Sequence, residues 1–143
     1  MPKSAREKDL DPDTFIGIGL PLGYSSKGFF KQTKTSLEQA GHNIRNLLLT
    51  IPGERVNQPE FGSRLHHLLF EQVDDDFIDE VEMAIRDSIE QWLPYITLDS
   101  IEIQEPDVYD AQTKNEAHIK LRFGLAFEPD RLEELTFILP VGF

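Results

Sequence analysis

Residues 117–127 read AHIKLRFGLAF, and their alternation of apolar and polar residues decides the fold class. The residues that share the apolar face are Ala117, Ile119, Leu121, Phe123, Leu125 and Phe127. The residues between them, on the opposite face, are His118, Lys120, Arg122 and Gly124. A period of two with one apolar face is typical of an antiparallel strand whose other face meets water. We therefore expect a half-buried strand here.

Two further strands are predicted, one on each side of this strand in the sequence. Ile101 and Ile103 alternate with polar residues before it, and residues 134–141 follow it. The apolar residues of this last strand are Phe137, Leu139 and Val141. Residues 128–134 have the composition of a turn. Because Pro140 has no N–H for a strand ladder, we expect the last strand at an edge of the sheet.

Helical periodicity precedes the strands. Apolar residues recur at helical spacing over residues 37–51 and 77–92, and a short helix is expected near residues 61–69. A capping-box pattern begins at residues 35–36, because Glu or Gln follows three residues later. Residues 52–53, Pro-Gly, should end the first of these helices.

The N-terminal part lacks strong periodicity. Residues 1–14 are polar and include two prolines, which predicts a flexible arm. Residues 15–30 hold four glycines and one proline among large apolar residues, a mixture that favours neither a long helix nor a central strand. We expect an extended apolar segment that packs either on the chain's own core or on a neighbouring protein.

The order of these elements predicts an α+β fold, in which an extended arm and two to three helices precede a small antiparallel three-strand sheet. Residues 15–143 are expected to form a single domain. Its helical part should lie at about residues 35–93 and its sheet part at about residues 96–141.

The chain is acidic, with 14 Lys+Arg against 26 Asp+Glu and a formal net charge of −12. This balance argues against nucleic-acid binding, since phosphate neutralisation needs excess cations, and against binding to anionic lipid. The absence of cysteine excludes disulfides, thiolate metal sites and cysteine nucleophiles. No apolar run approaches the roughly 20 residues that span a bilayer, and the N-terminus has no hydrophobic stretch of a signal peptide. We expect a protein that stays in a cytoplasm-like compartment.

The acidity is concentrated in the second half. Residues 74–99 hold nine acids and one arginine, beginning with three consecutive aspartates where a helix should start. This stretch is either the solvated face of a helix or a docking surface for a basic partner.

A metal site is poorly supported. His66 and His67 are adjacent on a predicted helix, so their side chains should point about 100° apart rather than converge on one ion. The other two histidines lie elsewhere in the sequence.

Charged residues between the predicted helices suggest structure rather than catalysis. Glu54 adjoins Arg55, and Arg64 lies four residues after Glu60. A carboxylate that pairs with arginine stays ionised, which makes it a poor general acid near neutral pH. We interpret these charges as ion pairs that fix a bend between two helices.

The same segment carries the most specific pattern in the chain. Residues 47–55 read LLLTIPGER, Asn57 follows, and residues 59–63 and 68–71 then read PEFGS and LLFE. In combination they resemble the gene-25-like baseplate wedge family of contractile-tailed phages and related injection machines. The resemblance extends over residues 15–139, although Gln72 stands where many members have proline.

The resemblance implies structural work in the tail baseplate of a virion that is assembled in the host cytoplasm. Members of the family meet larger wedge proteins through their helical part. Their terminal sheet starts polymerisation of the sheath protein by exchanging strands with the first sheath ring. Tail-tube or hub proteins are further candidate partners. The resemblance implies no cofactor and no enzymatic activity, although some members carry an older lysozyme label.

The residues expected to contact partners come from the first long helix, the bend and the last strand. They are Leu37, Ile44, Glu54, Arg55, Glu60, Arg64, Phe137, Leu139 and Val141. Two alternatives stay open. One is a peptidoglycan-cleaving, lysozyme-like enzyme that uses Glu54 or Glu60, and the other is an acidic adaptor that binds one basic partner without polymerising.

Overall fold

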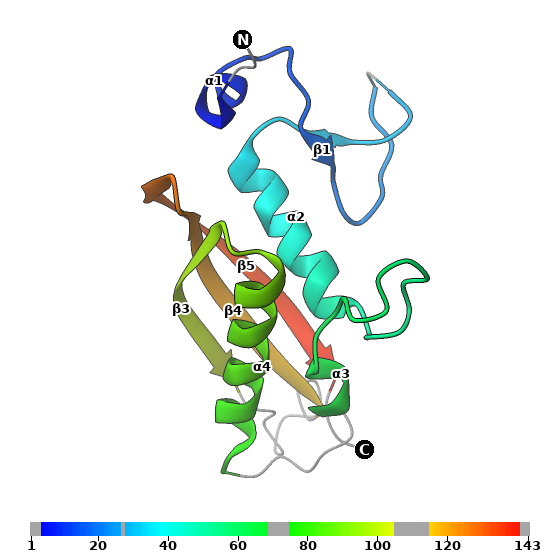
Figure 1. The fold of residues 1–143 in the computed structure, drawn as a ribbon, viewed down its shortest axis with the longest axis vertical. Coiled ribbons are helices and arrows are strands. Elements are labelled where there is room, and N and C mark those ends of the chain that lie inside the picture. Colours follow the sequence, from blue (N-terminus) through cyan, green and yellow to red (C-terminus); the bar gives the residue numbers. More distant parts are fainter. Residues whose placement is uncertain (1–3, 27, 69–74, 105–114, 141–143) are drawn as a thin grey trace. The chain divides into compact units, whose positions relative to one another are not determined.

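The computed structural model describes residues 4–26, 28–68, 75–104 and 115–140, and its fold is α+β, as the sequence predicts (Figure 1). The chain divides into two compact units, Met1–Asn46 and Leu47–Phe143. The expected extent of the domain, residues 15–143, stays a prediction. No helix among the described residues is long and apolar enough to cross a membrane.

The first unit begins with a short helix that the polar composition concealed. Helix α1 spans Ala5–Asp9, inside the segment expected to be a flexible arm. The Glu7 N–H donates to the Ser4 hydroxyl at 3.3 Å, and the Ser4 N–H donates to the Glu7 carboxylate at 2.8 Å. This reciprocal capping box satisfies two N–H groups at the helix start. The sequence analysis did not predict this helix, and the flexibility of residues 1–14 stays a prediction.

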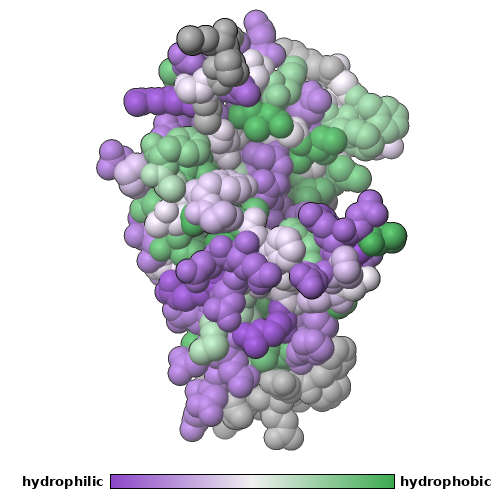
Figure 2. All heavy atoms as spheres, in the orientation of Figure 1, coloured by the Kyte–Doolittle hydropathy of each residue, from purple (hydrophilic) through white to green (hydrophobic). Residues whose placement is uncertain are grey.

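The glycine-rich segment forms a minimal strand pair. Strand β1 (Gly17–Ile18) pairs antiparallel with β2 (Gln32–Thr33), and the Leu20 N–H donates to His42 Nδ1 at 3.0 Å. The large side chains between the two strands that stay exposed include Leu22, Tyr24 and Phe29. Figure 2 shows hydrophobic residues gathered over this part of the chain. These three side chains do not pack on the chain's own core, and docking on a neighbour stays a prediction.

Helix α2 spans Ser36–Leu49 and begins as the capping pattern predicts. The Thr35 hydroxyl accepts a hydrogen bond from the Glu38 N–H at 3.2 Å, and the Glu38 carboxylate accepts one from the Lys34 N–H at 3.2 Å. The apolar residues that α2 buries are Leu37, Ala40, Ile44, Leu47 and Leu48. The helix ends before Pro52, as the sequence predicts. Thr50, two positions before Pro52, already belongs to the bend described below.

The second unit contains two helices followed by the sheet. Helix α3 spans Leu65–Leu68, so it begins later than the helix expected near residues 61–69, and residues 69–74 lie outside the described residues. Helix α4 spans Phe77–Trp92 and packs on the first strand of the sheet. The residues that α4 buries are Phe77, Val81, Ala84, Ile85, Ser88 and Ile89. Asp76 occupies the N-cap position of α4, and residue 74 lies outside the described residues.

The sheet has the predicted antiparallel topology. Its strands are β3 (Ile96–Gln104), β4 (Glu116–Leu125) and β5 (Glu128–Pro140), in the order β3-β4-β5. The fully buried residues of β4 are Ala117, Ile119, Leu121, Phe123 and Leu125, each with 0% exposure. The alternating pattern therefore identified the central strand and its core face.

Two details around the β4–β5 turn correct the sequence predictions. Residues 128–134 belong to β5 and are not a turn, because the chain reverses already after Leu125. Phe127 lies in that reversal and is 48% exposed, so it does not continue the apolar face of β4. Pro129 and Asp130 are turn-forming types, but an edge strand tolerates proline, and pairing with β4 overrides the local preference.

Candidate functional site: the bend after α2 and the edge of the sheet

The first candidate surface is the bend, by which we mean the segment between Leu49 of α2 and Leu65 of α3. It is held by hydrogen bonds to the last carbonyl groups of α2. The final carbonyls of a helix have no partner inside the helix. Here the Thr50 N–H donates to the Leu47 carbonyl at 3.3 Å, and the Ser63 hydroxyl donates to the Leu48 carbonyl at 2.8 Å. The Ser63 N–H also donates to the Thr50 carbonyl at 3.1 Å. Ser63 thus closes the bend by binding the end of α2 at two points.

Two glycines give the bend its shape. Gly62 has a φ of +139°, and a Cβ placed there would lie 2.5 Å from the Thr50 carbonyl oxygen and 2.9 Å from the Pro52 nitrogen. Gly53 has a φ of +101° but faces open space, and its N–H donates to the Pro59 carbonyl at 2.7 Å. Gly62 is therefore required for close approach of two backbone segments, whereas Gly53 is required only for its backbone angle.

Glu54 and Arg55 lie in this bend, but they do not form the ion pair expected from their adjacency. The Glu54 carboxylate accepts a hydrogen bond from the Ile51 N–H at 2.9 Å, which closes a tight turn. The Arg55 guanidinium carbon lies 4.0 Å from the centroid of the Phe61 ring. Phe61 in turn meets Trp92 of α4 edge to face, with 5.2 Å between ring centroids. Arg55 is held by an aromatic stack rather than by a carboxylate.

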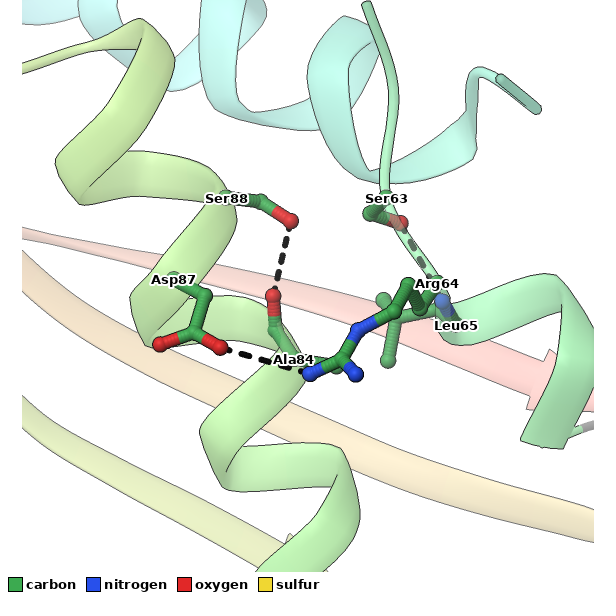
Figure 3. A network of polar contacts seen from close by, with 6 residues as sticks. All are labelled: Ser63, Arg64, Leu65, Ala84, Asp87 and Ser88. Atoms are coloured by element: carbon green, nitrogen blue, oxygen red, sulfur yellow. Dashed lines mark hydrogen bonds and ion pairs between the residues drawn. The ribbon is translucent and has the colours of Figure 1, made fainter. Parts of the chain in front are cut away.

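Arg64 finds a partner far away in the sequence. Its guanidinium lies 3.3 Å from the Asp87 carboxylate on α4, and both side chains are largely exposed (Figure 3). Arg64 therefore pairs with Asp87 and not with Glu60, so the expected Glu60–Arg64 pair is wrong as well. An exposed pair of this kind contributes about 0–1 kcal/mol. The bend is therefore fixed mainly by backbone hydrogen bonds and by the Phe61–Trp92 contact.

The loop between Gly53 and Pro59 presents side chains to solvent. Arg55, Val56, Asn57 and Gln58 line a shallow cleft of about 490 Å³. Val56 is 96% exposed, which is unusual for a branched apolar side chain and marks a knob on the surface. Sequence reasoning did not single out Val56, because one apolar residue in a polar loop gives no periodic signal.

The predicted contact residues outside the bend have different environments. Leu37 and Ile44 of α2 are buried, so the isolated chain does not present them at its surface, and contact through them stays a prediction. Phe137 and Leu139 of β5 are buried on the core face of the sheet. Val141 lies outside the described residues.

The second candidate surface is the edge of the sheet at β5. Among the described strands, β5 pairs with β4 alone, in nine consecutive residue pairs from Gly124↔Leu132 to Glu116↔Pro140. The other edge strand, β3, has an irregularity in its register between Leu98 and Ser100. Ile138 lies near the end of β5 and is 50% exposed. Among the strands that the structure describes, β5 therefore offers the longer regular edge.

The adjacent histidines do not diverge as expected. The His66 and His67 rings have centroids 3.9 Å apart at an interplanar angle of 39°. His66 Nδ1 also lies 3.1 Å from the Ser63 carbonyl oxygen. Among the described residues, no group of three or more His, Asp or Glu side chains could hold a metal ion.

Comparison with known proteins places this arrangement in a family. The model of the family described as Baseplate wedge protein gp25 matches residues 35–130, which is more than half of the chain. The chain belongs to this family. The match includes the whole bend, α4 and the first two strands of the sheet, so it confirms the resemblance found in the sequence.

Individual relatives agree with this assignment. Baseplate wedge protein gp25 of Enterobacteria phage T4 is 28% identical over 103 residues, which cover 72% of this chain and 74% of that protein. A Geobacter sulfurreducens protein described as a tail lysozyme has a TM-score of 0.66 at 21% identity, covering 78% of this chain and 96% of that one. A chain in the baseplate of the anti-feeding prophage has a TM-score of 0.56 at 22% identity, covering 88% and 85%. The two structural likenesses concern the fold alone.

Family membership makes the chain a baseplate wedge protein of contractile tail systems, a component of phage or tail-like particles. The bend is the part of the matched region with the most specific sequence pattern. Its geometry explains why that pattern contains glycine, serine and an aromatic residue in consecutive positions.

We predict that Gly62→Ala destabilises the protein by about 2 kcal/mol or more, because the added Cβ meets backbone atoms and the positive φ disfavours alanine. Gly53→Ala is the matched control, and it should cost only about 1 kcal/mol, since its Cβ meets open space. Urea unfolding of the three proteins measures both values. Equal losses for the two variants would contradict the close approach at Gly62.

Proposed function

We propose that this chain joins larger wedge proteins through the bend and initiates growth of the sheath by accepting a strand at β5. The observation that carries the second half of this proposal is the regular, singly paired edge of β5. An edge strand exposes N–H and C=O groups that another chain can bind. Strand addition at such an edge is an established mode of protein recognition.

The two edges of the sheet are not equivalent for this purpose. A β-bulge bends a strand and interrupts its ladder, and the irregularity in β3 falls between Leu98 and Ser100, in the middle of that strand. β5 has its irregularity only near the turn, at the position of Leu125, and is regular from Leu132 onward. A straight partner strand therefore fits β5 better than β3.

The energy of such an addition comes from backbone groups and from repetition. Each hydrogen bond contributes about 0.5–1.5 kcal/mol net. Several bonds on one β5 edge give a weak contact, and copies of that contact around a ring act together as a template. Phe137 and Leu139 need not be exposed for this, because they hold β5 on the core while its edge stays available.

The bend supplies the contact with the larger wedge proteins in this proposal. Arg55 is fixed on Phe61, and Val56 projects beside it. A rigid loop loses little conformational entropy on binding, which favours a specific contact. Tail-tube or hub proteins are further candidates for surfaces of the chain outside this loop.

We also propose that the chain is not an enzyme. A glycosidase needs two carboxylates on either side of the bond that it cleaves. The clefts of the described residues around Arg64, around Glu90 and around Val56 contain at most one acidic residue each. Glu54 is engaged by the Ile51 N–H, which further supports a structural role.

We predict that Ile138→Pro stops sheath growth while the chain still enters baseplates. Pro140 has no N–H to donate to β4, so we infer that its nitrogen faces away from β4. Ile138 lies two positions earlier, and its N–H therefore faces the same way, toward the free edge. A proline at position 138 removes this donor from the edge. Ile138→Thr keeps the N–H and is the control. Electron microscopy of reconstituted baseplates with sheath protein measures the outcome, and full-length sheath on the proline variant would refute strand addition at β5.

We predict that Arg55→Ala lowers the yield of assembled wedges severalfold, with only a small loss of stability, because one cation–π contact contributes about 0.5–1 kcal/mol. Arg86→Ala is the control, since Arg86 is an exposed arginine on α4 that pairs with Glu82 at 2.7 Å. Sedimentation of mixtures with the larger wedge proteins measures the yield. Equal yields from both variants would remove the special role of the bend.

We predict that the purified chain releases no soluble fragments from peptidoglycan, and that Glu54→Gln and Glu60→Gln change nothing in that assay. A hen-type lysozyme serves as the positive control. Fragment release that disappears in either variant would establish the enzyme alternative. Salt-sensitive one-to-one binding to a basic partner, without ordered rings in micrographs, would instead support the adaptor alternative.

A further inference from the structure

We propose that the charge of Glu133 prevents most strands from pairing with the free edge of β5, a role that we call the guard of this edge. Strand addition is then restricted to a partner strand that carries lysine or arginine beside Glu133. This inference rests on the proposed role of β5 and adds the chemistry of the strand that β5 accepts. The observation behind it is the position of Glu133 in the sheet. An acidic residue occupies a place on the core face where each later position of β5 is apolar.

The register of the sheet defines this place. Glu133 lies directly opposite Phe123, and Phe123 lies opposite Leu98 of β3. Residues opposite one another in antiparallel strands share a face. Phe123 is fully buried on the core face, so Glu133 lies on that face too, at its outer margin. The next residues of β5 on this face are Leu135, Phe137 and Leu139.

Glu133 remains exposed in spite of this position. The ion pairs of β5 in the described residues join Glu134 to Lys120 at 3.2 Å and Glu128 to Arg131 at 3.9 Å, and none of them uses Glu133. The Glu133 carboxylate is therefore hydrated in the isolated chain. A strand added at β5 would cover it and remove part of that water.

Inward-pointing charges are one of the devices by which proteins prevent edge strands from pairing indiscriminately. The irregularity of β3 is another such device, and the two differ in one respect. A bulge is a property of the backbone that an incoming strand cannot remove. A charge is neutralised by an opposite charge, so an edge guarded by Glu133 is closed to most strands and open to a complementary one.

The chemistry of the accepted strand follows from the residues along β5. Residues 128–134 contain four acids and one arginine, whereas residues 135–139 are apolar except for one threonine. The complementary strand is basic where it lies beside Glu133 and apolar or β-branched where it lies beside Leu135–Leu139. A second copy of β5 is a poor match, because Arg131 is its only basic residue.

Self-association of the full chain tests the guard directly. We expect wild type to stay monomeric and Glu133→Val to form dimers or larger species at the same concentration in analytical ultracentrifugation. Glu134→Val is the matched control, because Glu134 lies opposite Arg122 on the other face of the same strand, and it should stay monomeric. A monomeric Glu133→Val protein, or a wild type that already associates through β5, would overturn the proposal.

Two synthetic peptides test the chemistry of the partner. Both are twelve residues of alternating valine and threonine, and one carries lysine at both ends while the other carries glutamate, so that either strand direction is served. We expect wild type to bind the lysine peptide about tenfold more tightly than the glutamate peptide at low salt. The reason is that Glu133 forms an attractive cross-strand pair with lysine and a repulsive one with glutamate. Glu133→Lys should reverse the preference. No binding of the lysine peptide, or equal binding of both, would refute the charge rule.

This result is separable from the test of strand addition itself. If Ile138→Pro blocks sheath growth but Glu133→Lys leaves both sheath growth and peptide preference unchanged, β5 is the site and Glu133 is not its guard. If Ile138→Pro leaves sheath growth intact, the proposed function fails first. The melting temperature of each variant shows that a loss of binding is not a loss of fold.

Discussion

The hydrogen bonds between Ser63 and the end of α2 are the constraint on which the bend depends. A carbonyl buried without a partner costs about 1–3 kcal/mol, and the Ser63 hydroxyl satisfies the Leu48 carbonyl at 2.8 Å. The same hydroxyl lies 3.4 Å from the Leu65 N–H at the start of α3, so one side chain links the end of one helix to the start of the next. Gly62 allows this approach because any Cβ would meet the Thr50 carbonyl. The pattern of an aromatic residue, glycine and serine is thus a physical requirement of the bend.

Much of the fold was readable from the sequence because burial there follows a local period. The alternation in β4 and the helical stripes of α2 and α4 each fill one face, and the buried residues match them. The partners of charged residues were not readable. Arg64 meets Asp87, which lies 23 positions away, and Arg55 meets the face of Phe61 rather than its neighbour Glu54. Charge spacing along a chain reports local partners only, whereas tertiary packing brings distant ones closer. The extension of β5 into residues 128–134 was not predicted either, because pairing with β4 overrides the local turn preference of these residues.

The bend and the edge of β5 are both held in place by the fold and exposed to solvent, but different interactions hold them. In the bend, backbone hydrogen bonds such as Gly53 N–H to the Pro59 carbonyl hold a loop whose tip, Val56, is almost fully exposed. In β5, Phe137 and Leu139 anchor the strand on the core while its outer backbone groups lack a neighbouring strand in the described structure. Each surface is preorganised, so a partner that bound there would order few new groups and retain more of the favourable energy of binding.

In the role proposed above, the sheet accepts a strand during assembly, and it would have to avoid accepting one too early. Closing an edge by backbone shape, as in β3, is permanent, because no partner can change the register of a folded sheet. Closing it by charge is conditional, since a cation supplied by the partner offsets part of the cost of covering a carboxylate. In the proposed role of β5, this distribution of the two devices over β3 and β5 would direct strand addition to β5. Because the conditional device is electrostatic, high salt should weaken the guard and the attraction of the correct partner together, so discrimination between strands is greatest at low ionic strength.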